Sequence, residues 1–256
     1  MFVRSADFQI TAVYDGTNIG DLRKEWNKVA HSGHICRDGS CPFVKQTSFD
    51  YDPTQFLYYR ARAITTDVPN GNGDMFPYKE VQAAYKTFIG KGVFFNHNSE
   101  DPDNAFGIIL DAVFHGQFNP AYVEILAALD REVTEEKHPG LIKKITNGIS
   151  TSTSMSCLCE RAECSICNNV AHNAMQLCAH MNPDSPNFVK GRKTSHGALT
   201  FEKNFELTFS EDSVVGIPAD NTAHIFQVFA SLRSANTLEE IRIRLSEISE
   251  LLSKYD

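Results

Sequence analysis

The 256-residue sequence contains no uninterrupted apolar run near the roughly 20 residues that a membrane-spanning helix needs. Its longer apolar stretches, such as residues 106–110, end at a charge. Residues 1–14 also lack the continuous apolar segment of a secretory signal. We therefore expect a soluble protein that is not exported and has no membrane partner.

Basic residues are also scarce, because 24 Lys and Arg stand against 32 Asp and Glu, a net charge of −8. Their one tight cluster, at Lys190, Arg192 and Lys193, is too short to coat a nucleic-acid groove, so we interpret it as a solvated loop. A glycine-rich GxGxxG turn, a P-loop and a steady alternation of strands and helices are absent. These absences disfavour a nucleic-acid partner and a doubly wound nucleotide fold.

The pattern that is present is rich in β-strand. Residues 56–65 alternate with period two and are rich in aromatic side chains, and a loop dense in turn residues follows at 67–74. Helical spacing runs from Pro77 to Phe88, and a second short helix is expected at 139–146. The other short β-type runs lie at 93–95, 106–114, 122–129 and 199–209. We predict an α+β, β-rich domain over 51–230.

The two ends differ from this domain. Residues 1–50 are mixed in character and are interpreted as an N-terminal extension. Residues 236–256 begin with a capping box at Thr237 and Glu240 and carry apolar residues at heptad spacing, which predicts an amphipathic C-terminal helix. That helix either docks on a partner surface or packs on its own domain, and the pattern does not choose between the two.

Five of the seven cysteines fall within the 22 residues from Cys157 to Cys178. In a chain without an export signal, this distribution favours metal ligation over disulfides. A CxxC turn followed by Cys-x-His predicts a zinc knuckle, an insertion at 157–182, whose ligands are Cys164, Cys167, Cys178 and His180. Four protein ligands leave no position for water, so we expect one structural zinc and no cofactor for catalysis. Cys157, Cys159 and His172 remain substitute ligands.

A second group of candidate ligands lies near the N-terminus, at His31, His34, Cys36 and Cys41. Its spacing matches no standard metal site, and we interpret these residues as part of a loop. The sequence leaves open whether Cys36 and Cys41 bind anything.

Residues that could form a serine nucleophile and its base are also present. His97 follows the apolar strand at 93–95, where a side chain can project from a sheet edge, although a structural hydrogen-bonding histidine is the ordinary alternative. The hydroxyl-rich run at 148–156 alternates Ser and Thr with β-formers, and could equally be an exposed strand. Composition alone does not choose between these interpretations.

In their order, these segments resemble the prohead, or capsid maturation, proteases of tailed bacteriophages, which share the fold of the herpesvirus assemblin proteases. The resemblance covers roughly 56–225. It is carried by Asn70 to Pro77 with the helix after it, Phe95-Asn-His97, Phe106 to Asp111, Gly148 to Ser156, the Cys-x-x-Cys and Cys-x-His insertion, Phe205 to Val215, and Pro218 to Asp220. It implies a herpesvirus-protease-like β-barrel with flanking helices, and the insertion is similar to that of a large-phage branch.

The resemblance implies that His97 is the general base, Ser154 the nucleophile and Asp212 the group that orients the histidine. Ser150 also matches the nucleophile pattern, and Glu211 could replace Asp212, a one-residue shift that would turn the carboxylate to the other face of its strand. The family usually has Ser-x-Gly, whereas this chain has Ser156 at the glycine position. An added side chain there could weaken or abolish turnover.

The implied function is that of a serine endopeptidase that cleaves scaffold and capsid proteins, and itself, within the procapsid or virion head in the host cytoplasm. Its expected partners are those proteins and, through the C-terminal helix, a second copy of itself. One alternative is a protease-fold virion or assembly protein that has lost activity. A second alternative is a zinc-knuckle module that binds a protein partner.

Overall fold

The computed structural model describes residues 12–15, 55–194, 196–197 and 199–230. Most of the predicted N-terminal extension and the whole predicted C-terminal helix at 236–256 lie outside these residues, as do His31, His34, Cys36 and Cys41. In the part that is described, no helix is both long enough and apolar enough to cross a membrane.

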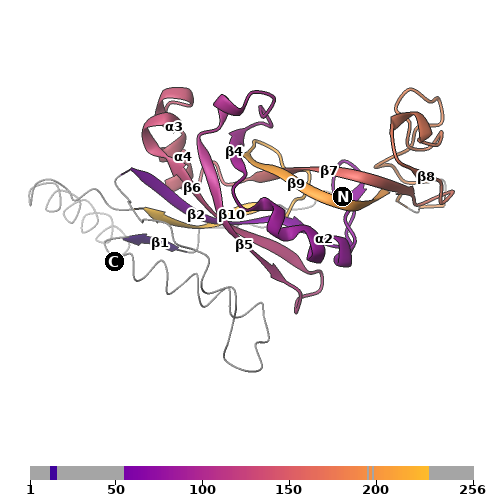
Figure 1. The fold of residues 1–256 in the computed structure, drawn as a ribbon, viewed down its shortest axis with the longest axis horizontal. Helices are drawn as coiled ribbons and strands as arrows, with labels where there is room; N and C mark the ends of the chain where they lie inside the picture. Colours follow the sequence, from indigo (N-terminus) through magenta and orange to yellow (C-terminus); the bar gives the residue numbers. More distant parts are fainter. Residues whose placement is uncertain (1–11, 16–54, 195, 198, 231–256) are drawn as a thin grey trace, which may run out of the picture.

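Ten strands form one mixed sheet in the order β1-β10-β2-β6-β5-β4-β9-β7-β8, with β3 paired to β9 (Figure 1). Their bounds are Ala12–Asp15 (β1), Phe56–Thr65 (β2), Asp74–Met75 (β3), Gly92–Phe95 (β4), Gly107–His115 (β5), Tyr122–Asp130 (β6), Thr153–Cys164 (β7), Val170–Ala171 (β8), Glu202–Val214 (β9) and His224–Ala230 (β10). The five predicted β-type runs correspond to β2, β4, β5, β6 and β9, so the β-rich prediction is confirmed.

The sheet is open, so the predicted closed barrel is wrong. Its path ends at β1 and β8. Ser152, the residue before β7, forms an isolated bridge with His224 of β10. A strand that closed the barrel would have to pair with the free edge of β10. From Gln227 to Ala230 this edge is paired with β1. A continuous ladder between β7 and β10 therefore does not form.

The helices are few and short. The predicted helix after Pro77 is confirmed as α2 (Tyr78–Ala84), continued by the 3-10 turn η2 (Tyr85–Phe88). The predicted helix at 139–146 is α4 (Leu141–Thr146), and it is preceded by α3 (Arg131–Lys137), which was not predicted. The Asp130 side chain caps α3 by accepting from the Val133 N–H at 3.0 Å. Two further 3-10 turns are η3 (Pro102–Asn104) and η4 (Ala174–Gln176).

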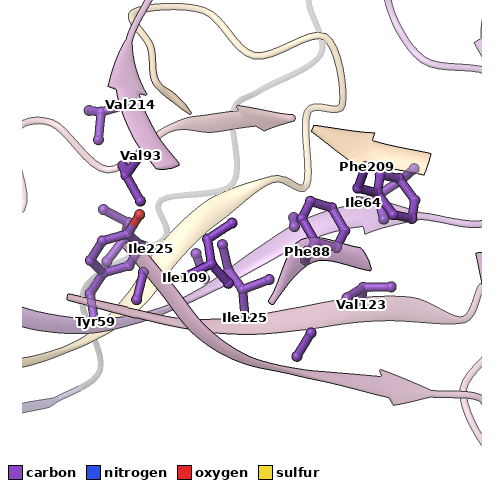
Figure 2. Close-up of a cluster of buried hydrophobic side chains, with 14 of the residues drawn as sticks. Tyr59, Ile64, Phe88, Val93, Ile109, Val123, Ile125, Phe209, Val214 and Ile225 are labelled. Atoms are coloured by element: carbon purple, nitrogen blue, oxygen red, sulfur yellow. The ribbon is translucent and has the colours of Figure 1, made fainter. Parts of the chain in front are cut away.

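The main core lies between the sheet and α2 with η2. Period-two alternation puts Tyr59, Ala61 and Ala63 of β2 on this side, where they are fully buried. The rings of Phe88 and Phe209 stack with centroids 4.1 Å apart, which fixes η2 on β9 (Figure 2). β9 is thereby packed against the core, and β3, β4 and β7 all pair with it.

Candidate active site and metal cluster

The centre of the candidate active site is the end of β9, where alternation separates two neighbouring carboxylates. Glu211 and Ser213 lie on one face of the strand and Asp212 on the other, and all three side chains are buried. The adjacent strands place their own residues by register: Ser156 pairs with Glu211, and Ser154 pairs with Ser213. Two hydroxyls of β7 are thereby aligned with the Glu211 face of β9.

His97 is held beside this face by the turn that ends β4. Asn96 and His97 both have left-handed backbone, with φ values of 51° and 60°. Such conformations are costly for residues other than glycine and persist where their surroundings hold them. Here the Asn96 N–H donates to the Val214 carbonyl at 3.0 Å, and the His97 N–H donates to Ser213 Oγ at 3.1 Å.

The Glu211 carboxylate binds the imidazole of His97 directly, with Oε1 2.6 Å from Nδ1. Two hydroxyls also donate to it, Ser156 Oγ to Oε1 and Ser213 Oγ to Oε2, each at 2.6 Å. Burial opposes ionisation of Glu211, but the hydrogen bonds from His97, Ser156 and Ser213 outweigh it and lower its pKa. An ionised carboxylate can only accept, so Nδ1 of the neutral imidazole carries the proton and Nε2 is left as the acceptor.

Asp212, which the resemblance placed beside His97, points to the other face of β9. Its Oδ2 accepts a hydrogen bond from the Tyr59 hydroxyl at 3.4 Å, and its Oδ1 is buried without a partner. Burial and the neighbouring Glu211 charge raise the pKa of Asp212 well above its ordinary value, although the Tyr59 hydrogen bond opposes them. The structure therefore brings Glu211, the alternative carboxylate, to His97, because side chains one residue apart on a strand face opposite ways.

The raised pKa of Asp212 predicts a pH-dependent effect of Asp212→Asn on stability. Below the ordinary Asp pKa of about 3.9 the group is protonated in both the folded and the unfolded chain. As the pH rises, only the unfolded chain ionises, so wild-type stability falls until the pH reaches the raised folded pKa. Asn does not titrate, so the unfolding free energy of Asp212→Asn should rise relative to wild type from about pH 4 upward, by up to about 1.4 kcal/mol per pH unit, until the pH reaches the raised folded pKa.

Denaturant unfolding of both proteins across this pH range measures the difference. Tyr59→Phe is the matched control: it leaves Asp212 buried and removes the one hydrogen bond that lowers its pKa, so the pH dependence should persist. A difference between Asp212→Asn and wild type that stays constant with pH would contradict a neutral Asp212.

Ser154 and His97 line the same cavity, which has a volume of about 360 Å³. Ser154 is 8% exposed and lies two residues before Ser156 on the same face of β7. The His97 ring contacts Ser156 Oγ at 3.2 Å through Nδ1, the nitrogen that also faces Glu211. Ser150, the rival nucleophile, lies in the turn after α4, where its N–H donates to the Lys144 carbonyl, and it does not line this cavity.

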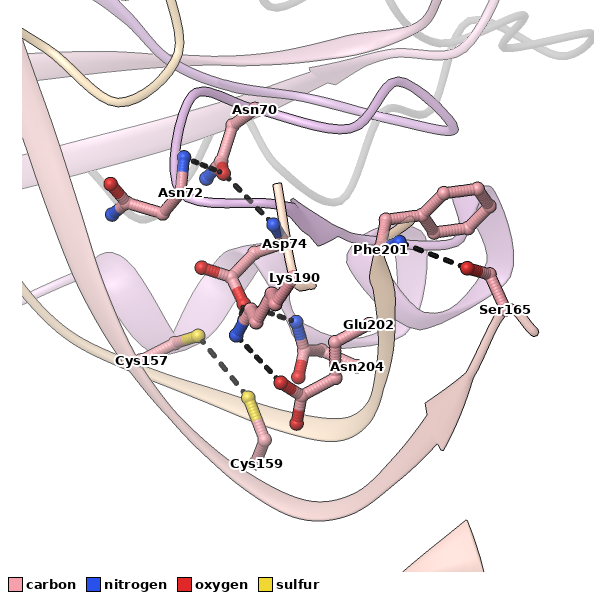
Figure 3. A network of polar contacts seen from close by, with 10 residues as sticks. All are labelled: Asn70, Asn72, Asp74, Cys157, Cys159, Ser165, Lys190, Phe201, Glu202 and Asn204. Carbon is pink, nitrogen blue, oxygen red and sulfur yellow. Dashed lines mark hydrogen bonds and ion pairs between the residues drawn. The ribbon is translucent and has the colours of Figure 1, made fainter. Parts of the chain in front are cut away.

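The cavity lining also includes the polar residues Asn70, Asn72, Asp74 and Asn204, which lie close together in Figure 3. Asn70 closes the predicted loop by accepting from the Asn72 and Asp74 N–H groups at 2.9 and 3.0 Å. Lys190 forms ion pairs with Asp74, which lines the cavity, and with Glu202, both at 2.6 Å, so it is ion-paired rather than freely solvated. The loop approaches Lys190 closely because residue 73 is glycine: a Cβ there would lie 2.5 Å from the Gly191 nitrogen.

The predicted metal ligands come together at and beyond Cys164, the last residue of β7. The ligand atoms of Cys164, Cys167, Cys178 and His180 all lie within 4.8 Å of one another. His180 Nδ1 is 3.8 Å from the sulfurs of both Cys164 and Cys178. Three thiols and an imidazole at these separations could hold one metal ion and are compatible with tetrahedral zinc.

The local sequence explains how this cluster forms. β7 delivers Cys164, and a turn with left-handed Asn168 (φ 57°) brings Cys167 back beside it. The turn is closed by the Asn168 N–H donating to the Cys164 carbonyl and the Cys164 N–H donating to the Asn169 carbonyl, both at 3.0 Å. The substitute ligands lie elsewhere: the His172 ring contacts the Glu160 carbonyl, and Cys157 lies beside Cys159.

Sequence reasoning missed the roles of two serines. The sequence marks Ser156 only as a departure from a glycine and assigns Ser213 no role, yet both hydroxyls donate to Glu211. The sequence signal for Ser213 is its spacing, because residues 211 and 213 of one strand point to the same face. Only the pairing register of β7 with β9 could have added Ser156.

Comparisons with protein-family models, with curated proteins and with solved structures find no match for this chain.

Proposed function

We propose that this chain is a serine endopeptidase. The observation that carries the proposal is the buried Glu211 carboxylate bound to His97 Nδ1 at 2.6 Å, in the wall of a cavity that Ser154 also lines. A histidine oriented by a buried acid, with its other nitrogen free to accept a proton near a serine, is the arrangement that activates a hydroxyl for acyl transfer.

In this proposal each residue has one role. Ser154 Oγ attacks the carbonyl carbon of the scissile peptide while Nε2 of His97 takes its proton. Glu211 holds the proton on Nδ1 and stabilises the imidazolium that forms. His97 then returns a proton to the leaving amine, and water releases the acyl group from Ser154 by the same sequence in reverse. Ser156 and Ser213 are positioning residues, since their hydroxyls hold the carboxylate of Glu211.

The substrate class follows from the resemblance of the ordered motifs to the prohead proteases. We infer cleavage of phage scaffold and capsid proteins, and of the protease itself, within the procapsid or virion head in the host cytoplasm. The Cys3His cluster, which we assign to zinc, has a structural role in this scheme, because four protein ligands close the metal to substrate. The predicted C-terminal helix would dock the enzyme on the scaffold or on a second copy.

The alternative is an assembly protein that keeps these residues without turnover. The contact of Ser156 Oγ with His97 Nδ1 favours it, because a hydroxyl stands where the family has glycine. A fluorophosphonate probe separates the two candidates. An activated serine displaces fluoride from its phosphorus, forming a stable Ser–O–P bond, whereas an unactivated serine does not react.

The test is peptide mapping after incubation of the folded chain with this probe. Trypsin releases residues 145–161 as one peptide, within which fragmentation distinguishes Ser150, Ser154 and Ser156. We expect the label on Ser154, its loss in Ser154→Ala and in urea, and its retention in Ser150→Ala. A folded chain that takes no label would move the assignment to the inactive assembly protein, and a label on Ser150 would contradict the assigned nucleophile.

A further inference from the structure

The cavity has a second reactive group that the proposed peptidase chemistry does not use. Cys157 and Cys159 lie on β7 just beyond Ser156, and both line the cavity. Their sulfurs are 3.5 Å apart, and Figure 3 shows the two thiols directed at each other. Cys159 is exposed and Cys157 partly exposed, so small molecules can reach the pair.

Strand geometry explains why these two thiols meet. Residues i and i+2 of a strand point to the same face, and their Cα atoms are roughly 6.6 Å apart. Disulfides span Cα separations of about 4.4–6.8 Å. The pair therefore lies near the upper end of the range, and a side-chain rotation can bring the sulfurs from 3.5 Å to bonding distance.

The pair is not part of a metal site. Among the described residues, the ligand groups of three or more comprise only the Cys164, Cys167, Cys178 and His180 cluster. Two thiols without a third ligand form a poor zinc site, because zinc in proteins takes at least three protein ligands. The chemistry left to two adjacent and accessible thiols is their own oxidation.

We propose that Cys157 and Cys159 form a redox-active dithiol that closes to a disulfide by exchange with a small-molecule disulfide. The hydrogen bond between the sulfurs lowers the pKa of Cys159 and, with burial, raises that of Cys157. Cys159, the more exposed of the two, is therefore the attacking thiolate, and Cys157 is the resolving thiol.

The exchange takes two steps. Cys159 Sγ attacks one sulfur of oxidised glutathione, the glutathione S–S bond breaks, and one glutathione thiolate leaves. Cys157 then loses its proton to solvent and attacks Cys159 Sγ, which expels the second glutathione thiolate. The protein loses two electrons and two protons, and one disulfide is reduced to two thiols. The new bond lies in the cavity wall next to Ser156.

The test uses the zinc-loaded full chain, incubated with oxidised glutathione, alkylated with iodoacetamide and digested with trypsin. The peptide 145–161 contains Cys157 and Cys159 and no other cysteine, while 162–190 contains the three cysteine ligands. We expect neither cysteine of peptide 145–161 to be alkylated, and the mass of this peptide to be two hydrogen atoms below that of its dithiol form. Dithiothreitol should restore alkylation of both cysteines. After the metal is removed, all three cysteines of peptide 162–190 should be alkylated.

Two variants give the order of attack. In Cys157→Ser the exchange should stop with one glutathione on Cys159, and in Cys159→Ser adduct formation should be markedly slower. The proposal is overturned if the wild-type peptide keeps both alkylation sites, if it stops at a stable glutathione adduct, or if either cysteine is found joined to a different one.

Discussion

Glu211→Gln should reduce peptide cleavage by about 10³–10⁴-fold while leaving the chain folded. In serine peptidases, replacing the orienting carboxylate by its amide costs about 10⁴ in kcat, because the imidazole is then held in the wrong tautomer. Here the Gln amide would donate to His97 Nδ1 across the 2.6 Å contact, and the proton would move to Nε2. Nε2 could then no longer accept the proton of Ser154.

The measurement is kcat/KM on a scaffold or capsid peptide, with labelling by the fluorophosphonate probe as a readout independent of substrate choice. Asp212→Asn is the matched control, since it makes the same chemical change one residue along, on the Tyr59 face of β9. We expect it to keep activity within a few-fold of wild type. Equal losses in both variants would contradict the assignment of Glu211, and a loss confined to Asp212→Asn would restore the original interpretation.

Removal of the metal should unfold residues 165–182, the part of the predicted insertion that follows β7. Binding of structural zinc to small knuckles contributes about 10–16 kcal/mol at neutral pH, because the site is not preformed in the unfolded chain. Cys164 is the last residue of β7, and Ser165 next to it accepts a hydrogen bond from the Phe201 N–H at 2.9 Å. Loss of the metal should therefore loosen the nearby ends of β7 and β9.

Metal analysis of the purified chain should find one zinc per molecule, and Cys178→Ser should lower this to none after dialysis. The matched control is Cys159→Ser, which removes a thiol of β7 outside the cluster and should keep one zinc. Hydrogen exchange after chelation should show faster exchange in 157–190 than in β2 or β6. Retention of zinc by Cys178→Ser would contradict the ligand set.

How far the fold could be predicted depends on the range of the forces involved. β2 is a ten-residue run of alternating, aromatic-rich sequence, and its predicted bounds match the structure. α3 was missed because its seven residues, Arg131–Lys137, carry almost no apolar periodicity and depend on the Asp130 cap. The barrel prediction failed because closure depends on which strand takes the free edge of β10, and β1, which takes it, is far away in sequence.

The sequence by itself determined the β-rich class and the cluster of candidate metal ligands, because the CxxC and Cys-x-His spacing is a local property of one turn and its neighbour. It also determined that His97, Glu211, Asp212, Ser150 and Ser154 were the residues to consider. Only the tertiary structure decided which of them lie together. The pairing of β9 with β4 and β7 sets which face of β9 meets His97. Because these segments are far apart in the chain, only the folded structure shows that Glu211, rather than Asp212, lies beside the imidazole.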